Sequence, residues 1–225
     1  MDPAPALSDG LAAVLFDMDG LLVDSEPQWF AAETRTVQQL GGVWGKQQQL
    51  DLLGSNLAFA AEYMIEHTES DRPAQEVMEL LLENMTDELS RGVTFRPGAL
   101  ELVSNLASEG IAMALVTSSV RVHVEAVLQH VAGDPFQAIV TADDVTRLKP
   151  HPEPYLTALD VIGAAAAQTV VLEDSPTGIA SAEAAGCIVV GIPSVVPIPA
   201  APTRTVWSSL VGADVTTLRS LVTRS

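Results

Sequence analysis

The chain has 225 residues, of which 48% are hydrophobic and 18% charged, and this fits one large domain or a core domain with a smaller insert. Eleven Lys and Arg residues stand against 29 Asp and Glu residues, so the formal net charge is -18. Nucleic acids and anionic membrane surfaces attract clustered cations, so this balance argues against both as partners.

A single cysteine, Cys187, can form neither an internal disulfide nor a Cys-rich metal site. No apolar stretch reaches the roughly 20 residues that span a bilayer. Residues 1–10 lack the basic segment and apolar segment of a secretory signal. We therefore expect a cytoplasmic protein, and we take the monomer as the default assembly.

The first predicted element is a strand over residues 11–16, which form an uninterrupted apolar run. Short runs of this kind are typical of strands that are buried on both faces of a parallel sheet.

Residues 26–95 show no clear strand, and their amphipathic stretches predict an all-helical block. These stretches are residues 29–40, 57–67 and 73–90. The block interrupts the order of strands and helices, so we expect an inserted helical cap subdomain, with residues 1–25 and 96–225 as the core. Twelve acidic and four basic side chains make the block a poor general trap for anions.

Apolar runs and helical spacing alternate from about residue 98 to residue 192. The further predicted strands are residues 111–116, 138–140, 169–172 and 188–192. This alternation predicts an α/β fold whose core is a doubly wound, Rossmann-like parallel sheet. The Pro-rich stretch 193–205 is typical of an irregular surface connection.

Two carboxylates, Asp17 and Asp19, directly follow the first predicted strand, and Gly20 comes next. Ligands of open α/β sheets bind outside the carboxyl ends of the strands, so both side chains are placed to act. A turn that only caps the strand is the alternative interpretation. An EF-hand loop is excluded because its glycine belongs at the sixth position of the motif, whereas Gly20 is at the fourth.

Thr117 and Ser118 follow the strand predicted at 111–116, where hydroxyl and backbone N–H groups can bind an oxyanion. The same pattern is also common at helix N-caps. Lys149 precedes a proline, which favours extended backbone and leaves its ammonium group able to reach into a crevice. It is one of only two lysines in the chain.

Glu173 and Asp174 follow another predicted buried strand. Together with the carboxylates after the first strand they would form a site of hard oxygen ligands, which suits Mg²⁺.

The segments DMDG, TSS, KP and EDS, in that order, resemble the haloacid-dehalogenase superfamily of phosphotransferases. The longer segments DMDGLLVDSEP and EDSPTGIASAEAAG carry most of this resemblance, which covers nearly the whole chain. The helical insertion after the first strand resembles the branch that holds β-phosphoglucomutase and many sugar-phosphate phosphatases.

The resemblance implies that Asp17 is the nucleophile that becomes an aspartyl phosphate, and that Asp19 is the general acid and then the general base. It implies that Thr117, backbone amides around Ser118, and Lys149 hold the phosphoryl oxygens.

The same resemblance implies a Mg²⁺ site formed by Asp17, the backbone carbonyl of Asp19, and Asp174, with Glu173 as a ligand or an outer partner. Mg²⁺ and a lysine would offset the repulsion between a phosphate and these carboxylates.

We therefore expect a Mg²⁺-dependent phosphomonoester hydrolase that acts on a small phosphorylated metabolite, a sugar or polyol phosphate. A phosphomutase of the β-phosphoglucomutase type is the first alternative, although residues 54–57 of the insert offer no cation for a second phosphate. A phospho-acceptor or scaffold protein without turnover is the second. Trp44, Lys46 and Gln47 are candidates for touching the substrate, and an exposed loop explains them equally well.

Overall fold

The computed structural model describes residues 10–52 and 55–223, and the chain divides into two compact units. The core unit comprises Met1–Asp24, Thr94–Val124 and Val131–Ser225, and the helical unit comprises Ser25–Val93 and Glu125–His130. The second segment of the helical unit belongs to a stretch that the sequence analysis assigned to the core.

The core unit is built on a six-stranded sheet in the order β5-β4-β1-β6-β7-β8, and every strand pair in it is parallel. The strands are β1 (Ala13–Phe16), β4 (Ala112–Val116), β5 (Ala138–Val140), β6 (Thr169–Glu173), β7 (Ile188–Gly191) and β8 (Arg204–Val206). The predicted α/β fold class with a doubly wound parallel sheet is confirmed.

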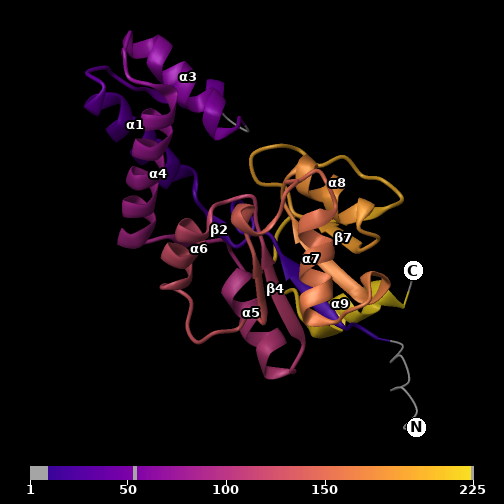
Figure 1. Cartoon of the computed structure of the whole chain (residues 1–225). Helices are drawn as coiled ribbons and strands as arrows, with labels where there is room; N and C mark the ends of the chain where they lie inside the picture. The colour runs from indigo at the N-terminus through magenta and orange to yellow at the C-terminus, as the bar shows by residue number, and fades with distance from the viewer. Residues whose placement is uncertain (1–9, 53–54, 224–225) are drawn as a thin grey trace. The chain divides into compact units, whose positions relative to one another are not determined.

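β1 lies between β4 and β6, and all four of its side chains are fully buried. Helices α7 (Glu153–Ile162) and α8 (Pro176–Ala184) pack on one side of the sheet, against β4, β5, β6 and β7. Helices α5 (Ala99–Ser108) and α9 (Val215–Val222) contact each other and the strands β4 and β6 (Figure 1). Burial by helices explains why the strands read as continuous apolar runs.

Three short strands were not predicted. The strand β8 begins at Arg204, inside the stretch that was expected to be irregular, so that expectation is wrong at its end. β8 lies at an edge of the sheet and its sequence, RTV, contains no apolar run. β2 (Val23–Asp24) and β3 (Thr94–Phe95) form a separate antiparallel pair, and two residues are too few to show a period.

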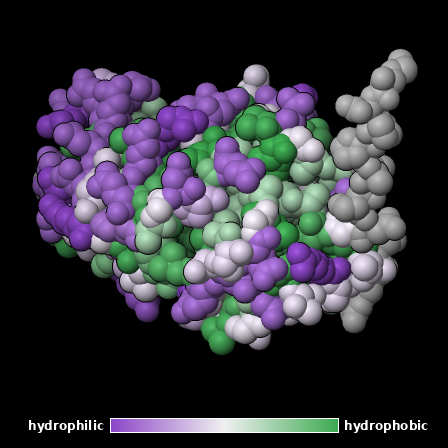
Figure 2. All heavy atoms as spheres, turned by 90° about the horizontal axis from the view of Figure 1, so that it is seen from below, coloured by the Kyte–Doolittle hydropathy of each residue, from purple (hydrophilic) through white to green (hydrophobic). Residues whose placement is uncertain are grey.

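The helical unit contains α1 (Glu26–Gln39), α2 (Lys46–Leu52), α3 (Leu57–Thr68) and α4 (Ala74–Arg91), and α4 packs against α1 and α3. The spacing of Val77, Leu80, Leu81 and Met85 predicts the apolar face of α4. Three of these side chains are at most 1% exposed, and Leu80 is half-buried. Hydrophilic residues cover most of the face of this unit that Figure 2 shows. No helix within the described ranges is long and apolar enough to cross a bilayer.

Candidate active site

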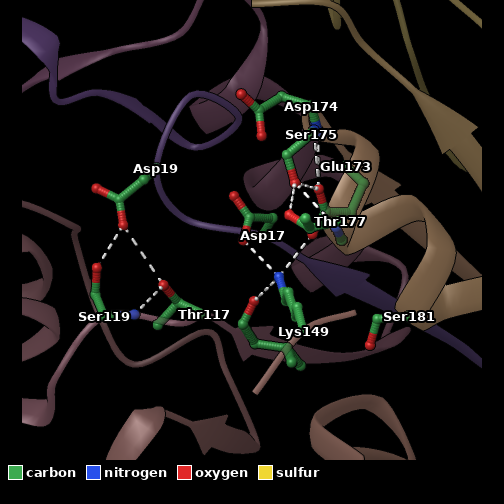
Figure 3. A network of polar contacts seen from close by, with 12 residues as sticks. Asp17, Asp19, Thr117, Ser119, Lys149, Glu173, Asp174, Ser175, Thr177 and Ser181 are labelled. Carbon is green, nitrogen blue, oxygen red and sulfur yellow. Dashed lines mark hydrogen bonds and ion pairs between the residues drawn. The ribbon is translucent and has the colours of Figure 1, made fainter. Parts of the chain in front are cut away.

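The carboxyl ends of three neighbouring strands bring the predicted site residues of the core unit together (Figure 3). Asp17 directly follows β1, Thr117 directly follows β4, and Glu173 is the last residue of β6. The register pairs Phe16 with Leu115 on one side and with Leu172 on the other, so the three strands end at the same level. Parallel pairing therefore places residues from distant parts of the sequence at one edge.

Lys149 lies at the centre of this group, with a side chain only 4% exposed. Its ammonium group donates to Asp17 Oδ1 at 2.6 Å, to Glu173 Oε1 at 2.6 Å and to the Val116 backbone oxygen at 2.9 Å. The ring of Tyr155 lies 4.9 Å from Nζ, in a cation–π contact. Three N–H donors thus have three acceptors.

Burial alone would lower the pKa of Lys149, but the carboxylates of Asp17 and Glu173 raise that pKa above its usual range. The ammonium group therefore stays charged in a buried position, where its positive charge can attract an anionic ligand that approaches Asp17.

Glu173 is fully buried and both of its carboxylate oxygens are engaged. Oε1 accepts from Lys149 and from the Tyr155 hydroxyl, which lies at 2.8 Å. Oε2 accepts from the backbone N–H groups of Asp174 and Ser175, each at 3.1 Å, and from the Ser175 hydroxyl at 3.0 Å. Five donors fix this carboxylate, so Glu173 is better suited to hold Lys149 than to bind a metal directly.

The donor set at this edge fits Mg²⁺. Asp17, Glu173 and Asp174 each have a carboxylate oxygen within 4.8 Å of those of the other two. Asp17 and Asp174 are the better candidates for direct ligands, because five donors already hold the Glu173 carboxylate. Burial raises the pKa of Asp17 well above its usual range, and burial together with Glu173 raises the pKa of Asp174 to about 7. Hard oxygen ligands that are costly to ionise together are the ones that a divalent cation stabilises.

Gly20 makes room for the Asp174 carboxylate. A Cβ atom on residue 20 would lie 2.0 Å from Asp174 Oδ2, and the backbone φ of Gly20 is +83°, a conformation that favours glycine. The glycine that follows the two aspartates thus allows both the turn and the close approach of the third carboxylate.

The Asp19 side chain reaches the segment that follows β4, where its Oδ2 accepts a hydrogen bond from the Ser119 hydroxyl at 2.7 Å. The Thr117 hydroxyl lies 3.5 Å from the same oxygen. Thr117 is buried, whereas Ser118, which lies between Thr117 and Ser119 in the sequence, is exposed. Two carboxylates, a buried ammonium group and a cluster of hydroxyls are groups that phosphoryl transfer through a covalent intermediate can use.

The family model of the haloacid dehalogenase-like hydrolases matches residues 14–192, which is most of the chain. The chain belongs to this family.

Two curated members are similar to this haloacid dehalogenase-like hydrolase along most of their length. Protein CbbY of Rhodobacter capsulatus is 33% identical over 197 residues, which cover 82% of this chain and 86% of CbbY. Hexitol phosphatase A of Escherichia coli is 34% identical over 181 residues, which cover 79% of this chain and 81% of the relative.

A solved structure of a haloacid dehalogenase-like protein is also similar. The crystal structure of CbbY from Rhodobacter sphaeroides in complex with phosphate is 26% identical to this chain, with a TM-score of 0.78. The match covers 90% of this chain and 96% of that one.

Two residues of the hydrolase site were not among the predicted site residues. Ser119 was visible only as the last member of the TSS segment, whose hydroxyls also suit a helix N-cap. Tyr155 follows the spacing of a buried helix face together with Leu159 and Ile162, and that spacing does not reveal where a hydroxyl points. The tyrosine hydroxyl nevertheless donates to Glu173.

The three candidates for touching the substrate all lie in the helical unit. Trp44 is 7% exposed and its indole N–H donates to Glu33 Oε2 at 3.0 Å, so it packs inside the unit and is not part of an exposed loop. Lys46 and Gln47 begin α2 and are exposed, and Gln47 donates to Asp51 at 2.9 Å.

Proposed function

We propose that this hydrolase is a Mg²⁺-dependent phosphatase that releases inorganic phosphate from a small sugar or polyol phosphate through an aspartyl-phosphate intermediate. The observation that supports this most is the meeting of Asp17, Lys149 and Asp174 at the end of β1, with Nζ of the lysine 2.6 Å from the proposed nucleophile.

In the first step Asp17 attacks the phosphorus atom in line with the leaving group, and Asp19 donates a proton to the departing alcohol oxygen. Thr117, the backbone N–H groups near Ser118, and Lys149 bind the phosphoryl oxygens. In the second step Asp19 removes a proton from a water molecule, which attacks the phosphoaspartate and releases phosphate. Covalent capture divides one slow hydrolysis into two faster displacements.

Asp17, Asp174 and the backbone carbonyl of Asp19 would hold the Mg²⁺ ion, while Glu173 holds Lys149. When bound, the ion offsets the repulsion between phosphate and carboxylates and neutralises charge in the transition state. Lys149 contributes a second, fixed positive charge on the same phosphoryl group.

The class of substrate is supported by the relatives. Hexitol phosphatase A, 34% identical over most of this chain, is named for a polyol phosphate. We further propose that residues 26–95 act as a cap that selects the leaving group, with Lys46 and Gln47 as its exposed candidates for contacting the substrate. A cytoplasmic location belongs to the same proposal, because a chain with one cysteine needs no oxidising compartment.

A panel of phosphomonoesters assayed for phosphate release with Mg²⁺ tests the proposal. Hexitol phosphates, pentose phosphates, glycerol 1-phosphate and β-glucose 1-phosphate belong in the panel, and the last is also assayed for isomerisation. We expect many turnovers with at least one sugar or polyol phosphate. Isomerisation without release would identify a mutase, and stoichiometric labelling without turnover would identify a phospho-acceptor; either result contradicts the proposed phosphatase. Of residues 54–57, which offer no cation for a second phosphate, Gly54 lies outside the described residues.

A further inference from the structure

Asp19 and Ser119 are joined across 100 residues of sequence by one short hydrogen bond. The Ser119 hydroxyl lies 2.7 Å from Asp19 Oδ2, while the Thr117 hydroxyl is at 3.5 Å, the outer limit for a hydrogen bond. In Figure 3 the carboxyl group of Asp19 points toward this pair of hydroxyls and away from Lys149. Ser119 is therefore the stronger of the two hydroxyl partners.

The backbone around Ser119 is itself held in place. Its N–H donates to the Thr117 hydroxyl oxygen at 3.0 Å, and its carbonyl accepts from the Ala142 N–H at 3.0 Å. The first bond ties Ser119 to the end of β4, and the second ties it to the segment that follows β5. The hydroxyl that reaches Asp19 is thus carried by a fixed turn.

We propose that Ser119 is a positioning residue that orients the Asp19 carboxyl group for proton transfer to the leaving group. This inference rests on the proposed function. An aspartate side chain can rotate about two bonds, and a general acid works only when one oxygen faces the atom that receives the proton. A hydroxyl that holds Oδ2 from a fixed turn selects one orientation of the carboxyl group.

The role of Ser119 depends on the leaving group. A polyol alkoxide is a poor leaving group and must receive a proton, whereas a nitrophenolate ion leaves without one. The ratio kcat/KM reports only the steps up to formation of the phosphoaspartate. It therefore excludes the hydrolysis of the phosphoaspartate, in which Asp19 acts as the general base whichever substrate was used. Loss of the Ser119 hydroxyl should therefore affect kcat/KM for the polyol phosphate selectively.

The experiment measures kcat/KM with sorbitol 6-phosphate and with p-nitrophenyl phosphate for the parent protein, Ser119→Ala and Ser119→Thr. Ser119→Cys, similar in size but a poor donor, is a second variant that loses the hydroxyl. Ser108→Ala is the matched control, because this serine is exposed at the end of α5. Thermal unfolding of each variant shows that it is folded.

We expect Ser119→Ala and Ser119→Cys to lower kcat/KM for sorbitol 6-phosphate about tenfold or more, with less than about a twofold change for p-nitrophenyl phosphate. Ser119→Thr keeps a hydroxyl and should retain most of the parent kcat/KM. In an Asp19→Asn background, Ser119→Ala should lower kcat/KM no further. An equal loss with both substrates, or no loss with either, overturns the role of Ser119 in an otherwise active phosphatase. The most active sugar or polyol phosphate of the panel replaces sorbitol 6-phosphate if the parent does not hydrolyse the latter. A parent protein that releases phosphate from no ester of the panel and not from p-nitrophenyl phosphate overturns the proposed function, and this inference with it.

Discussion

A Cβ atom on residue 178 would lie 1.7 Å from Oε1 of Glu173. Gly178 is in the first turn of α8, where its backbone N–H donates to the Ser175 hydroxyl at 3.0 Å. The Glu173 carboxylate therefore lies directly against this helix, in space that any side chain would fill. The position of Lys149 depends on that space, because Glu173 is one of its two carboxylate partners.

Gly178→Ala should destabilise the protein and reduce its activity. Alanine in a helix is favoured over glycine by roughly 1 kcal/mol, but displacement of a buried carboxylate from five donors should cost about 2–4 kcal/mol. We expect lower stability in urea unfolding and a loss of phosphate release of at least about a hundredfold. Gly10→Ala is the control, because a Cβ atom there meets no atom within 4 Å. Unchanged stability of Gly178→Ala would show that the carboxylate can move at little cost.

Asp17→Asn should abolish phosphate release and leave the protein folded. The amide is nearly isosteric with the carboxylate, and its oxygen can still accept from Lys149, but it cannot act as the nucleophile. We expect a loss of kcat of at least about a thousandfold in a phosphate-release assay, with an unchanged circular dichroism spectrum. Asp160→Asn, an exposed position on α7, is the matched control. Parent-like turnover of Asp17→Asn would show that another residue is the nucleophile.

Removal of divalent cations should silence the enzyme. Excess EDTA is expected to stop phosphate release, and added Mg²⁺ to restore it. Saturating Mg²⁺ should also stabilise the folded protein, by about 2–3 kcal/mol at a hundred times its dissociation constant. Asp174→Asn should lose this stabilisation in a thermal-shift experiment. Full activity in excess EDTA would argue against a metal site at this edge of the sheet.

The helical unit should become less stable as the pH rises from about 4 to about 7. Burial raises the pKa of Glu33 from its ordinary 4.5 to about 7, and the carboxylate of Glu26 adds to this, while the bond from Trp44 opposes it. Between these two values the folded state binds more protons than the unfolded state, so stability falls as the pH rises. This loss in the free energy of unfolding is complete above about pH 7 and absent below about pH 4.

Glu33→Gln keeps an acceptor for Trp44 and cannot ionise. At pH 8 we expect this variant to exceed the parent in stability by about 1–2 kcal/mol. At pH 4 the difference should nearly vanish. Urea unfolding at both pH values measures it, and Glu62→Gln on the exposed face of α3 is the control. A difference that is the same at both pH values would mean that Glu33 does not ionise in this range.

The sheet was predictable because burial on both faces leaves a strong signal. β1 reads as an unbroken apolar run, and the structure buries every one of its side chains. The meeting of Asp17 and Lys149 was expected from the order of the motifs DMDG and KP, and the structure places the two side chains 2.6 Å apart. β8 was not, because an edge strand of three residues with two polar side chains has no distinguishing period.

Roles that depend on the direction of one polar atom could not be predicted. Tyr155 reads as an ordinary residue of a buried helix face, and only the packing of α7 shows that its hydroxyl meets Glu173. Ser119 reads as a helix cap, and only the pairing of β1 with β4 brings it to Asp19. Trp44 stands in a polar stretch that suggests exposure, whereas the rings of Tyr63 and His67 pack edge-on against it.

The short ribbon of β2 and β3 has a consequence for how such proteins diversify. Asp24 pairs with Thr94, so the chain leaves and re-enters the core unit at adjacent positions. The two ends of the insertion are paired neighbours in this ribbon. An inserted segment of almost any length can therefore connect them, because it does not have to span a fixed distance. Evolution can therefore replace the helices between these two points without altering the strands β1, β4 and β6 of the core unit.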